Sequence, residues 1–561
     1  MIYIRTIAYN AAETLKRTVN SVLNQTCSDF RYFLCDNGST DGGETRRIIG
    51  EYAGCDERIV SFYNEKNHVW DKNDELLYLP HQIDEDDCFC VLDADDEYLP
   101  TFFQEMTTFM EEHHLDIAVC GSAFISAADK NKLQGHRLLP QNLILQGNAF
   151  ADYFTVYYQF MRTLWGKLLK GKTLRNTLIG PNAKGIPRAY GNDTFFTMRA
   201  FRDAQRVGIL AKSLHKYYIS AGSSSYVMHP ERVKSDQILY EAALEYLKPY
   251  GSISRENGRF LKLVYLNAIS DTLRVSLNAR ITPLENLHNI QEILKYNATK
   301  ELLNTNYARD KELNDKLRDP VTNWLIAHKE CWTQENGEMT ADIILAMYGH
   351  LARMLSRGSL SGVMNKMPEL IGALIKKDYN HVLRQLQERG KRHENDDPAL
   401  VELEVAIYRA SGKPADEIFR LLTDIKKNRP KSSTVVEADI SIERILQNYS
   451  LLRKISPDLA VSICDTVYWI IRGDIVRANE EFLQISANIE IEDKDTEDYL
   501  LLAQNLSASA KDSAAFIFFK KIWIAYLIDR SRNEEARNEL DEFEKLLPED
   551  EDFRELRQRI T

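Results

Sequence analysis

The sequence predicts an α/β domain with a mostly parallel sheet, followed by an all-helical region. In residues 1 to about 125, short apolar runs alternate with amphipathic segments. This alternation is typical of strands and covering helices in a parallel sheet. One run, residues 88–92, is continuously apolar, as expected for a strand buried on both faces. Beyond about residue 230 strand signals nearly vanish, and amphipathic helical patterns continue to the C-terminus.

Length and charge set the broad class. A chain of 561 residues is too long for one ordinary core, so several domains are expected. The predicted divisions are an α/β domain at 1–230, a helical linking region at 231–335 and an all-α domain at 336–561. The formal net charge of −12 argues against a general nucleic-acid binder.

The cysteines and the apolar segments predict a soluble, reduced protein. The eight cysteines include no CxxC pair, so we expect buried free thiols in a reducing compartment. No stretch approaches the roughly 18 consecutive apolar residues of a membrane span. The first residues do not resemble a signal peptide. A cytoplasmic location is therefore the expectation.

Each element of the N-terminal half is predicted from its own pattern. Strands are expected at 2–8, 31–35, 58–63, 88–92 and 115–125, because these runs are short and apolar. Helices are expected at 12–24, which has an apolar face, and at 101–113, which follows the turn at Pro100. The second strand ends in a run of turn-forming residues, 36–42.

Helical patterns dominate the rest of the chain. Long helices are predicted at 235–247 and 258–277, with a polar loop at 391–398. Residues 406–430 and 525–548 each have the pattern helix, turn, helix and terminal proline, which resembles tetratricopeptide-type helix pairs. An irregular helical bundle is an equal alternative. Either surface suits recognition of an acceptor, a partner or a second copy of the chain, and hence a homo-oligomer.

A carboxylate cluster follows the buried strand at 88–92. Asp93, Asp95 and Asp96 would repel one another unless a cation or a solvated bend relieves them. In extended backbone Asp93 and Asp95 would point to one side, and the small Ala94 would leave room beside them. Hard divalent cations take oxygen ligands and are often shared with substrate phosphates. The cluster therefore predicts a site for such a cation.

A second acidic residue is expected at the same edge of the sheet. Ligands of open α/β sheets bind outside the carboxyl ends of the strands, and Asp36 ends the second strand. Asp36 could accept hydrogen bonds from a ribose or a base. The segment after the first strand, residues 8–13, has no glycine, which disfavours a dinucleotide but not a mononucleotide.

Four motifs in order resemble family 2 glycosyltransferases with the GT-A fold. They are Ile7–Asn10, Ser21–Thr26, Asp36–Asp41 and Leu92–Asp96. The resemblance covers about residues 1–230, and the linked set is far more specific than any one piece. It implies a GT-A nucleotide-diphospho-sugar transferase domain.

The resemblance also implies roles in donor binding. Ala8, Tyr9 and Asn10 would line the nucleotide pocket, partly through backbone. Asp36 would bind the uracil or the ribose. Asp93, with Ala94 beside it, would reach the ribose or the sugar.

The metal and the base follow from the same resemblance. Asp95 would ligate Mn²⁺ or Mg²⁺, which bridges the diphosphate and stabilises charge on the leaving group. Gly191-Asn192-Asp193 resembles the family's Glu-Asp motif, whose aspartate is the general base, although Asn192 stands where glutamate is common. The segment Trp165–Leu168 resembles one that frames the acceptor side.

Each candidate also has a purely structural alternative. Asp36 could be only a turn residue, and Tyr9 a core aromatic. Asp95 and Asp96 could cap the next helix, and Asp193 could be the N-cap of a helix at 194–202. His229, near the end of the α/β domain, could contact the metal, but a surface-loop histidine is the simpler interpretation.

The predicted function is an inverting, metal-dependent glycosyltransferase. It would move a sugar from a nucleotide-sugar, expected to be UDP-linked, to a hydroxyl of a glycan or a protein. Three alternatives remain open. The chain could be a nucleotidyltransferase-like enzyme, although it lacks the usual glycine-rich basic loop. It could be a catalytically idle GT-A binding module, or a scaffold that acts through its C-terminal helices.

Overall fold

The computed structural model contains two compact units, residues 1–329 and 330–561. The structure describes residues 1–67, 83–129, 132–179, 191–220, 227–304, 311–328, 336–390, 495–509, 511–548 and 550–560, with a few isolated positions between 331 and 479. Each unit is described by itself below.

The first unit is built on a ten-stranded mixed sheet that is mostly parallel. The main path runs β3-β2-β1-β4-β9-β6-β10-β5, with β7 paired to β6 and β8 to β10. The four strands β3, β2, β1 and β4 are parallel neighbours, as are β6 and β10. The antiparallel β9 separates these two sets. The strands are β1 (Ile2–Ala8), β2 (Phe30–Asn37), β3 (Ile59–Asn64), β4 (Cys88–Val91), β5 (Glu97–Tyr98), β6 (Ile117–Ser126), β7 (Leu133–Arg137), β8 (Leu143–Gln146), β9 (Lys167–Lys170) and β10 (Arg206–Ile219).

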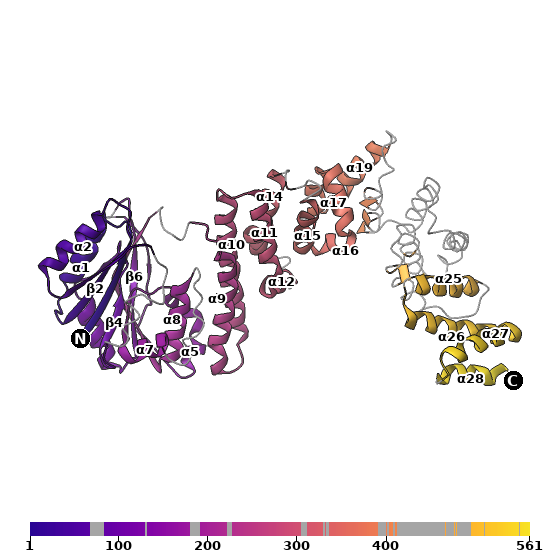
Figure 1. Cartoon of the computed structure of the whole chain (residues 1–561), viewed down its shortest axis with the longest axis horizontal. Coiled ribbons are helices and arrows are strands. Elements are labelled where there is room, and N and C mark those ends of the chain that lie inside the picture. The colour runs from indigo at the N-terminus through magenta and orange to yellow at the C-terminus, as the bar shows by residue number, and fades with distance from the viewer. Residues whose placement is uncertain are drawn as a thin grey trace. The chain divides into compact units, whose positions relative to one another are not determined.

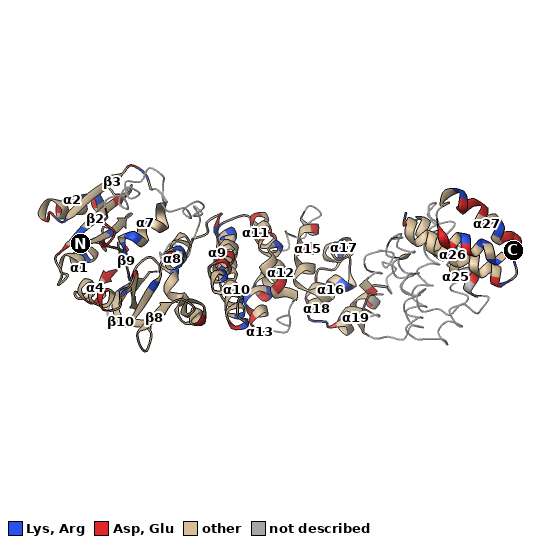
Figure 2. Ribbon diagram, turned by 90° about the horizontal axis from the view of Figure 1, so that it is seen from below, with Lys and Arg blue, Asp and Glu red and all other residues tan. Residues whose placement is uncertain are grey.

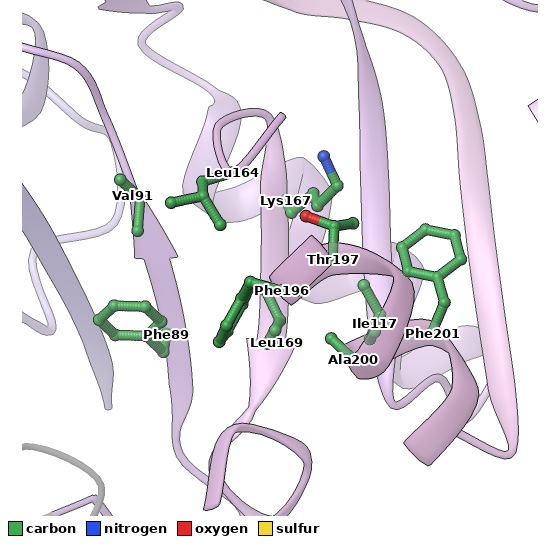
Figure 3. A pocket seen from close by; sticks show the side chains of 10 residues that line it. All are labelled: Phe89, Val91, Ile117, Leu164, Lys167, Leu169, Phe196, Thr197, Ala200 and Phe201. Atoms are coloured by element: carbon green, nitrogen blue, oxygen red, sulfur yellow. The ribbon is translucent and has the colours of Figure 1, made fainter. Parts of the chain in front are cut away.

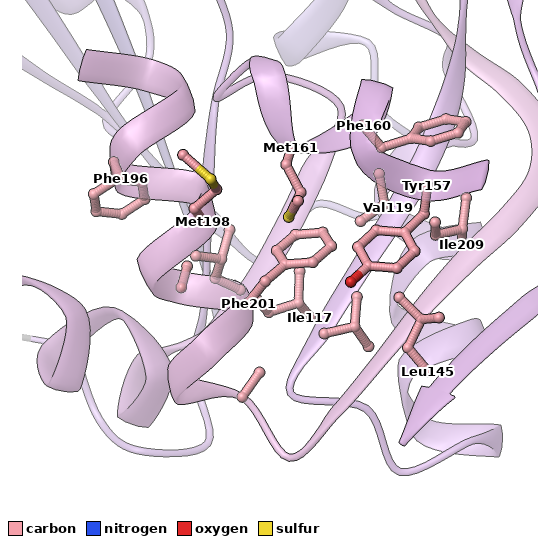
Figure 4. Packing of buried hydrophobic residues seen from close by; sticks show 14 of the residues in the cluster. Ile117, Val119, Leu145, Tyr157, Phe160, Met161, Phe196, Met198, Phe201 and Ile209 are labelled. Carbon is pink, nitrogen blue, oxygen red and sulfur yellow. The ribbon is translucent and has the colours of Figure 1, made fainter. Parts of the chain in front are cut away.

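Helices cover both faces of this sheet (Figure 1). On one face, α1 (Leu15–Leu23), α2 (Glu44–Cys55) and α4 (Phe102–Glu112) pack in one core with Ile4 and Ala8 of β1. On the other, α8 (Asn192–Asp203) packs through Phe196 and Phe201 against Val91 of β4 and its neighbours, in the cluster shown in Figure 4. Alternate residues of β1 therefore face different cores, and the odd-numbered Arg5 lies on the α8 side.

The elements predicted for residues 1–125 are confirmed. The five predicted strands are β1, β2, β3, β4 and β6, and the two predicted helices are α1 and α4, with bounds within a few residues. Helix α2 and the strands β9 and β10 were not predicted. Strand β10 carries Lys212, His215 and Lys216. It was missed because these polar residues interrupt the apolar run by which strands were predicted.

Helices complete the first unit. Helices α9 (Arg232–Leu247) and α10 (Arg255–Asn278) confirm the two long helices predicted there, and both begin three residues early. The others are the short α5 (Ala149–Asp152), α6 (Phe154–Tyr157) and α13 (Lys311–Leu313), and α7 (Gly171–Ile179), α11 (Pro283–Lys295), α12 (Asn297–Asn304) and α14 (Asp319–Ala327).

The second unit is helical throughout its described part. Its helices are α15 (Gly337–Met347), α16 (Gly349–Met354), α17 (Arg357–Lys366), α18 (Leu370–Ile375), α19 (Tyr379–Gly390), α25 (Asp495–Ser509), α26 (Ser513–Asp529), α27 (Asn533–Leu546) and α28 (Glu551–Ile560). Helices α26 and α27 confirm the helix pair predicted at 525–548. The loop at 391–398 and most of 406–430 lie outside the described residues, so the repeat stays a prediction.

Two further expectations can be compared with the structure. The seven cysteines in the described ranges are free thiols, as predicted, but Cys27 is only half-buried and Cys55 is exposed. None of the described helices combines the length and the apolar character that crossing a membrane requires. Charged side chains are spread over the helices, and α27 is notably acidic (Figure 2).

Candidate active site

The candidate site lies where the strand order reverses. From β1 the sheet continues to β2 on one side and to β4 on the other, and all three strands are parallel. Ala8 pairs with Asp36, and Arg5 pairs with Val91, so the strand ends meet at one edge. A crevice outside the carboxyl ends at such a reversal is the usual ligand site of open α/β sheets.

Asp36 is a buried carboxylate at the end of β2. Its Oδ1 accepts a hydrogen bond from the Ser39 backbone N–H at 3.1 Å, as a turn aspartate would. Its Oδ2 also lies 3.2 Å from Nε of Arg46, whose guanidinium lies 5.0 Å from the ring centroid of the exposed Tyr63. Asp36 is therefore a turn residue and, in addition, part of a cluster with an arginine and an exposed aromatic ring.

The segment after β1 presents its residues in different ways. Ala8 is fully buried, so only its backbone can meet a ligand. Tyr9 is 44% exposed, so the alternative of a core aromatic is wrong. Asn10 has a positive φ of 50° and joins the two strand ends. Its N–H donates to Ser39 Oγ at 2.9 Å, and its Oδ1 accepts from the Thr40 N–H at 2.7 Å.

The carboxylate segment 92–96 forms a turn. The Asp96 N–H donates to the Asp93 carbonyl at 3.1 Å, so the extended backbone predicted for this segment is wrong. Side chains of β1, of α1 and of the residue before α1 donate to its other carbonyls. These bonds run from Thr6 to Leu92 at 2.8 Å, from Thr14 to Ala94 at 2.9 Å, from Arg17 to Asp95 and from Thr18 to Asp96 at 2.8 Å. The backbone is thereby fixed, and the carboxylates of Asp93 and Asp95 remain exposed at the sheet edge.

Asp96 has a different role from its neighbours. Its side chain is fully buried, and helix α4 begins only after Thr101, so neither Asp95 nor Asp96 caps that helix. Oδ1 of Asp96 accepts from the Tyr218 backbone N–H at 3.0 Å, and Oδ2 lies 3.2 Å from Nε2 of the buried His215. Burial raises the pKa of Asp96, and burial together with Arg137 and Lys167 lowers that of His215. The pair is therefore favoured in its uncharged form.

Asp193 approaches the same edge from the other face of the sheet. Helix α8 begins at Asn192 after Gly191, which has a φ of +89°, so the alternative that Asp193 is the N-cap is wrong. Asp193 is the second residue of the helix and its side chain is exposed. Thr194 and Thr197 anchor this end of α8 by hydrogen bonds to the carbonyls of Arg162 and Thr163, at 3.2 and 3.0 Å.

The three exposed carboxylates share one electrostatic environment. Asp93, Asp95 and Asp193 remain open to solvent, yet protein surrounds them closely enough that desolvation raises the pKa of each. The negative charges of Asp96, Asp193 and Asp95, in that order, raise the pKa of Asp93 further. Carboxylates from separate segments therefore converge, and a cation would relieve their repulsion.

Two basic residues also lie at the site: Arg5 was not predicted, and Lys167 belongs to the Trp165–Leu168 segment that was expected to frame the acceptor side. Arg5 is 6% exposed on β1, and its positive charge lowers the pKa of both Asp93 and Asp193. Lys167, 2% exposed on β9, also lowers the pKa of Asp193, and its Nζ donates to the Thr163 carbonyl at 2.5 Å. Arg5 could have been noticed in the sequence, because it is the one charged residue in the predicted strand at 2–8.

The donor set suits a cation that is shared with a ligand. Across the described ranges, no group of three or more His, Cys, Asp and Glu side chains could by itself hold a metal ion. The protein would therefore supply one or two exposed carboxylates, with phosphate and water as the other oxygen ligands, as is common for Mg²⁺. His229 is exposed, and its Nδ1 accepts from the Glu231 N–H at 3.2 Å, as expected for a loop histidine.

A small cavity lies beneath this edge. It occupies about 10 Å³ and is lined mainly by apolar side chains of β4, β9 and α8, with Lys167 and Thr197 as its polar members (Figure 3). Such a volume holds about one water molecule. The candidate site is therefore the open edge itself.

Comparisons with known proteins find similarity to glycosyltransferases. Residues 3–170 match the model of glycosyl transferase family 2. The uncharacterized glycosyltransferase EpsJ of Bacillus subtilis strain 168 is 23% identical over 249 residues, which cover 43% of this chain and 68% of that relative. The putative glycosyltransferase EpsE of the same strain is 29% identical over 178 residues, covering 30% of this chain and 59% of the relative. A crystal structure of residues 1–349 of S. aureus TarS in complex with UDP has a TM-score of 0.35 and 17% identity, covering 58% of this chain and 92% of that one.

Proposed function

We propose that this chain, whose residues 3–170 match glycosyl transferase family 2, transfers a sugar from a UDP-sugar to an acceptor hydroxyl with inversion, releasing UDP and using a divalent cation. The observation that carries the proposal is the convergence of Asp93, Asp95 and Asp193 at one sheet edge, where their charges interact or share the same basic neighbours. A nucleoside diphosphate with its cation is the ligand that such a carboxylate edge suits.

Asp95 would hold Mn²⁺ or Mg²⁺ together with the diphosphate. The segment 92–96 supports this role, because four of its carbonyls are already occupied by side chains and the carboxylates of Asp93 and Asp95 face solvent. When bound, the cation stabilises the negative charge that develops on the departing diphosphate. Asp93 would contact the ribose or the sugar, with Ala94 leaving the space beside it.

Asp193 would act as the general base. A base must lie within reach of the acceptor hydroxyl and have a pKa closer to the working pH than a free carboxylate. Desolvation raises the pKa of Asp193, while Arg5 and Lys167 favour its ionised form. An acceptor that approaches the α8 side would be deprotonated as it attacks the anomeric carbon from the face opposite the diphosphate, which gives inversion.

The nucleotide would lie over the ends of β1, β2 and β3. Asp36 could accept from the uracil or the ribose, and the exposed rings of Tyr9 and Tyr63 offer surfaces for stacking. Asn10 would hold the two loops that frame the pocket, because its backbone and side chain both bridge to residues 39 and 40.

A thermal-shift screen tests the proposal. We expect UDP and UDP-sugars with Mn²⁺ to raise the unfolding temperature more than GDP or ADP with Mn²⁺, because a ligand selective for the folded state stabilises it. Hydrolysis of UDP-sugars in the presence of Mn²⁺ but not EDTA would separate an enzyme from an idle binding module. A chain that no sugar nucleotide stabilises would contradict the proposal.

We propose a binding role for the helices that follow the α/β domain. The segments 231–335 and 336–561 would bind the acceptor (a glycan or a protein), a partner, or a second copy of the chain. Their many exposed helical surfaces support such a task. Deletion of residues 336–561 that leaves UDP-sugar hydrolysis intact but abolishes transfer to the natural acceptor would support separate roles.

A further inference from the structure

A fully buried pair lies directly behind the carboxylate turn. Asp96, the last residue of the turn, and His215 of β10 both have no solvent exposure. Oδ2 of Asp96 and Nε2 of His215 lie 3.2 Å apart, and neither atom has a hydrogen-bond partner elsewhere in the described structure. Because buried polar atoms need partners, each of these two atoms depends on the other.

The pair joins the turn to the sheet behind it. The other oxygen of Asp96 accepts from the Tyr218 N–H at 3.0 Å, and its carbonyl accepts from Thr18 at 2.8 Å. Nδ1 of His215 lies 3.2 Å from Oγ of Ser122 on β6. A continuous polar chain therefore runs from helix α1 through Asp96 and His215 to strand β6.

Aromatic stacking holds the imidazole ring in place. The His215 ring stacks on Trp165 with centroids 4.4 Å apart and an interplanar angle of 25°, and the Tyr98 ring meets it edge-on at 5.5 Å. The Arg137 guanidinium lies 4.2 Å from the Trp165 ring centroid. Trp165 precedes Gly166 and β9, so the ring also connects the turn to the segment that carries Lys167.

We infer that Asp96 and His215 form a positioning pair, which fixes the turn so that Asp95 presents its carboxylate to the cation and ties it to the Trp165–Lys167 segment. The pair is closed off from solvent and touches no substrate. Its effect passes through Asp95, so this inference rests on the proposed function. Outer partners of this kind hold metal-binding side chains in orientation, and their loss weakens metal binding.

The test measures Mn²⁺ binding to the full-length protein with UDP present, by electron paramagnetic resonance titration. We expect His215→Leu to weaken Mn²⁺ binding by about tenfold or more. Asp96→Asn keeps an oxygen for the Tyr218 N–H and an amide donor for Nε2, and we expect it to retain most of the affinity. Leu210→Ala, a buried change elsewhere on β10, is the matched control and should leave Mn²⁺ binding unchanged.

Two outcomes overturn the inference alone: wild-type Mn²⁺ affinity in His215→Leu, or equal weakening in Leu210→Ala. Asp95→Asn is measured alongside them. Should this variant bind Mn²⁺ as well as the wild type does, the proposed metal role of Asp95 fails, and the inference falls with it. Where His215→Leu does not fold, Ser122→Ala removes only the hydroxyl beside Nδ1, and undiminished Mn²⁺ binding there would also overturn the inference.

Discussion

Asp193, in the first turn of α8, lies close enough to Asp93, in the turn after β4, for its charge to help raise the pKa of that residue. The two carboxylates come from elements that cover different parts of the sheet edge. Arg5 lies on the β1 face directed to α8 and favours the ionised form of both. The positive charge of the buried Arg5 therefore acts on both the donor-side carboxylate and the proposed base.

Asp95→Asn should abolish cation-dependent turnover. Loss of the anionic ligand removes charge stabilisation of several kcal/mol from the leaving diphosphate, so kcat should fall roughly 100-fold or more. The measurement is UDP-sugar hydrolysis against Mn²⁺ concentration. Asp86→Asn, which changes an exposed carboxylate at the opposite end of β4, is the control and should behave as wild type. Unchanged Mn²⁺ dependence in Asp95→Asn would remove this residue from the metal site.

Asp193→Asn should separate binding from transfer. The amide keeps the size and polarity of the side chain but accepts no proton, so kcat for transfer should fall by roughly 10² to 10⁴. The Kd for UDP with Mn²⁺, measured by calorimetry, should stay within a factor of about two of the wild-type value, because the substitution removes no contact to UDP. Normal transfer by this variant would mean that another group is the base.

Replacement of Arg5 should shift the pH dependence of transfer. The positive charge of Arg5 holds the pKa of Asp193 below the value that desolvation alone would give. In Arg5→Leu the base therefore stays protonated to higher pH, and the acidic limb of the kcat–pH profile moves upward. Arg5→Lys keeps the charge and should restore much of the wild-type profile. Ile7→Val, on the same face of β1, is the control, and equal shifts in it and in Arg5→Leu would refute the charge effect.

Because of Asp236, the first unit should be less stable at neutral pH than at acidic pH. Burial raises the pKa of Asp236 from 3.8 to about 6, although Thr272 and Arg232 oppose this. A carboxyl whose folded pKa is raised contributes stability that is complete below pH 3.8 and is lost as the pH rises through 6. At pH 8 the cost is at most about 3 kcal/mol.

Asp236→Asn should remove this slope. Urea unfolding should show the variant gaining stability relative to wild type at pH 8 but not at pH 4. Asp315→Asn, which changes an exposed carboxylate elsewhere in the first unit, is the control. A variant whose stability depends on pH as steeply as the wild type would show that Asp236 is not the source.

Gly191→Ala should destabilise the start of α8. Gly191 has a φ of +89°, and an added Cβ would lie 2.8 Å from Cδ1 of Leu239 on α9. The expected loss is roughly 1–3 kcal/mol of unfolding free energy. Gly258→Ala, inside α10 with its nearest contact at 4.0 Å, should instead be neutral or stabilising by up to about 1 kcal/mol. Equal effects at both positions would show that the backbone of Gly191 is not strained by a side chain.

The sequence was most informative where short apolar runs form neighbouring parallel strands. The strands β1 to β4 are contiguous apolar runs, so both their existence and the meeting of Ala8, Asp36 and the turn after Val91 could be predicted. Strand β9 inserts antiparallel between β4 and β6, and this depends on long-range pairing that no local pattern encodes.

Long-range pairing also explains which parts of the site were missed. Asp96 appeared to be a helix cap because caps are local, whereas its true partner is His215, far along the chain. Arg5 was visible as a charged residue within the strand at 2–8, but its role depends on Asp193 of α8, which comes close to it only after folding. The extended geometry predicted for Asp93 and Asp95 failed because a hydrogen bond from the Asp96 N–H to the Asp93 carbonyl closes a turn, and Thr14 and Thr18 hold two further carbonyls of this segment.

Calorimetric titration of UDP into the full-length protein tests the central claim most directly. With Mn²⁺ present we predict saturable binding that EDTA weakens strongly, that Asp95→Asn loses and that Asp193→Asn keeps. Binding of UDP that is indifferent to Mn²⁺ and to Asp95, or no binding of UDP at all, would contradict the account.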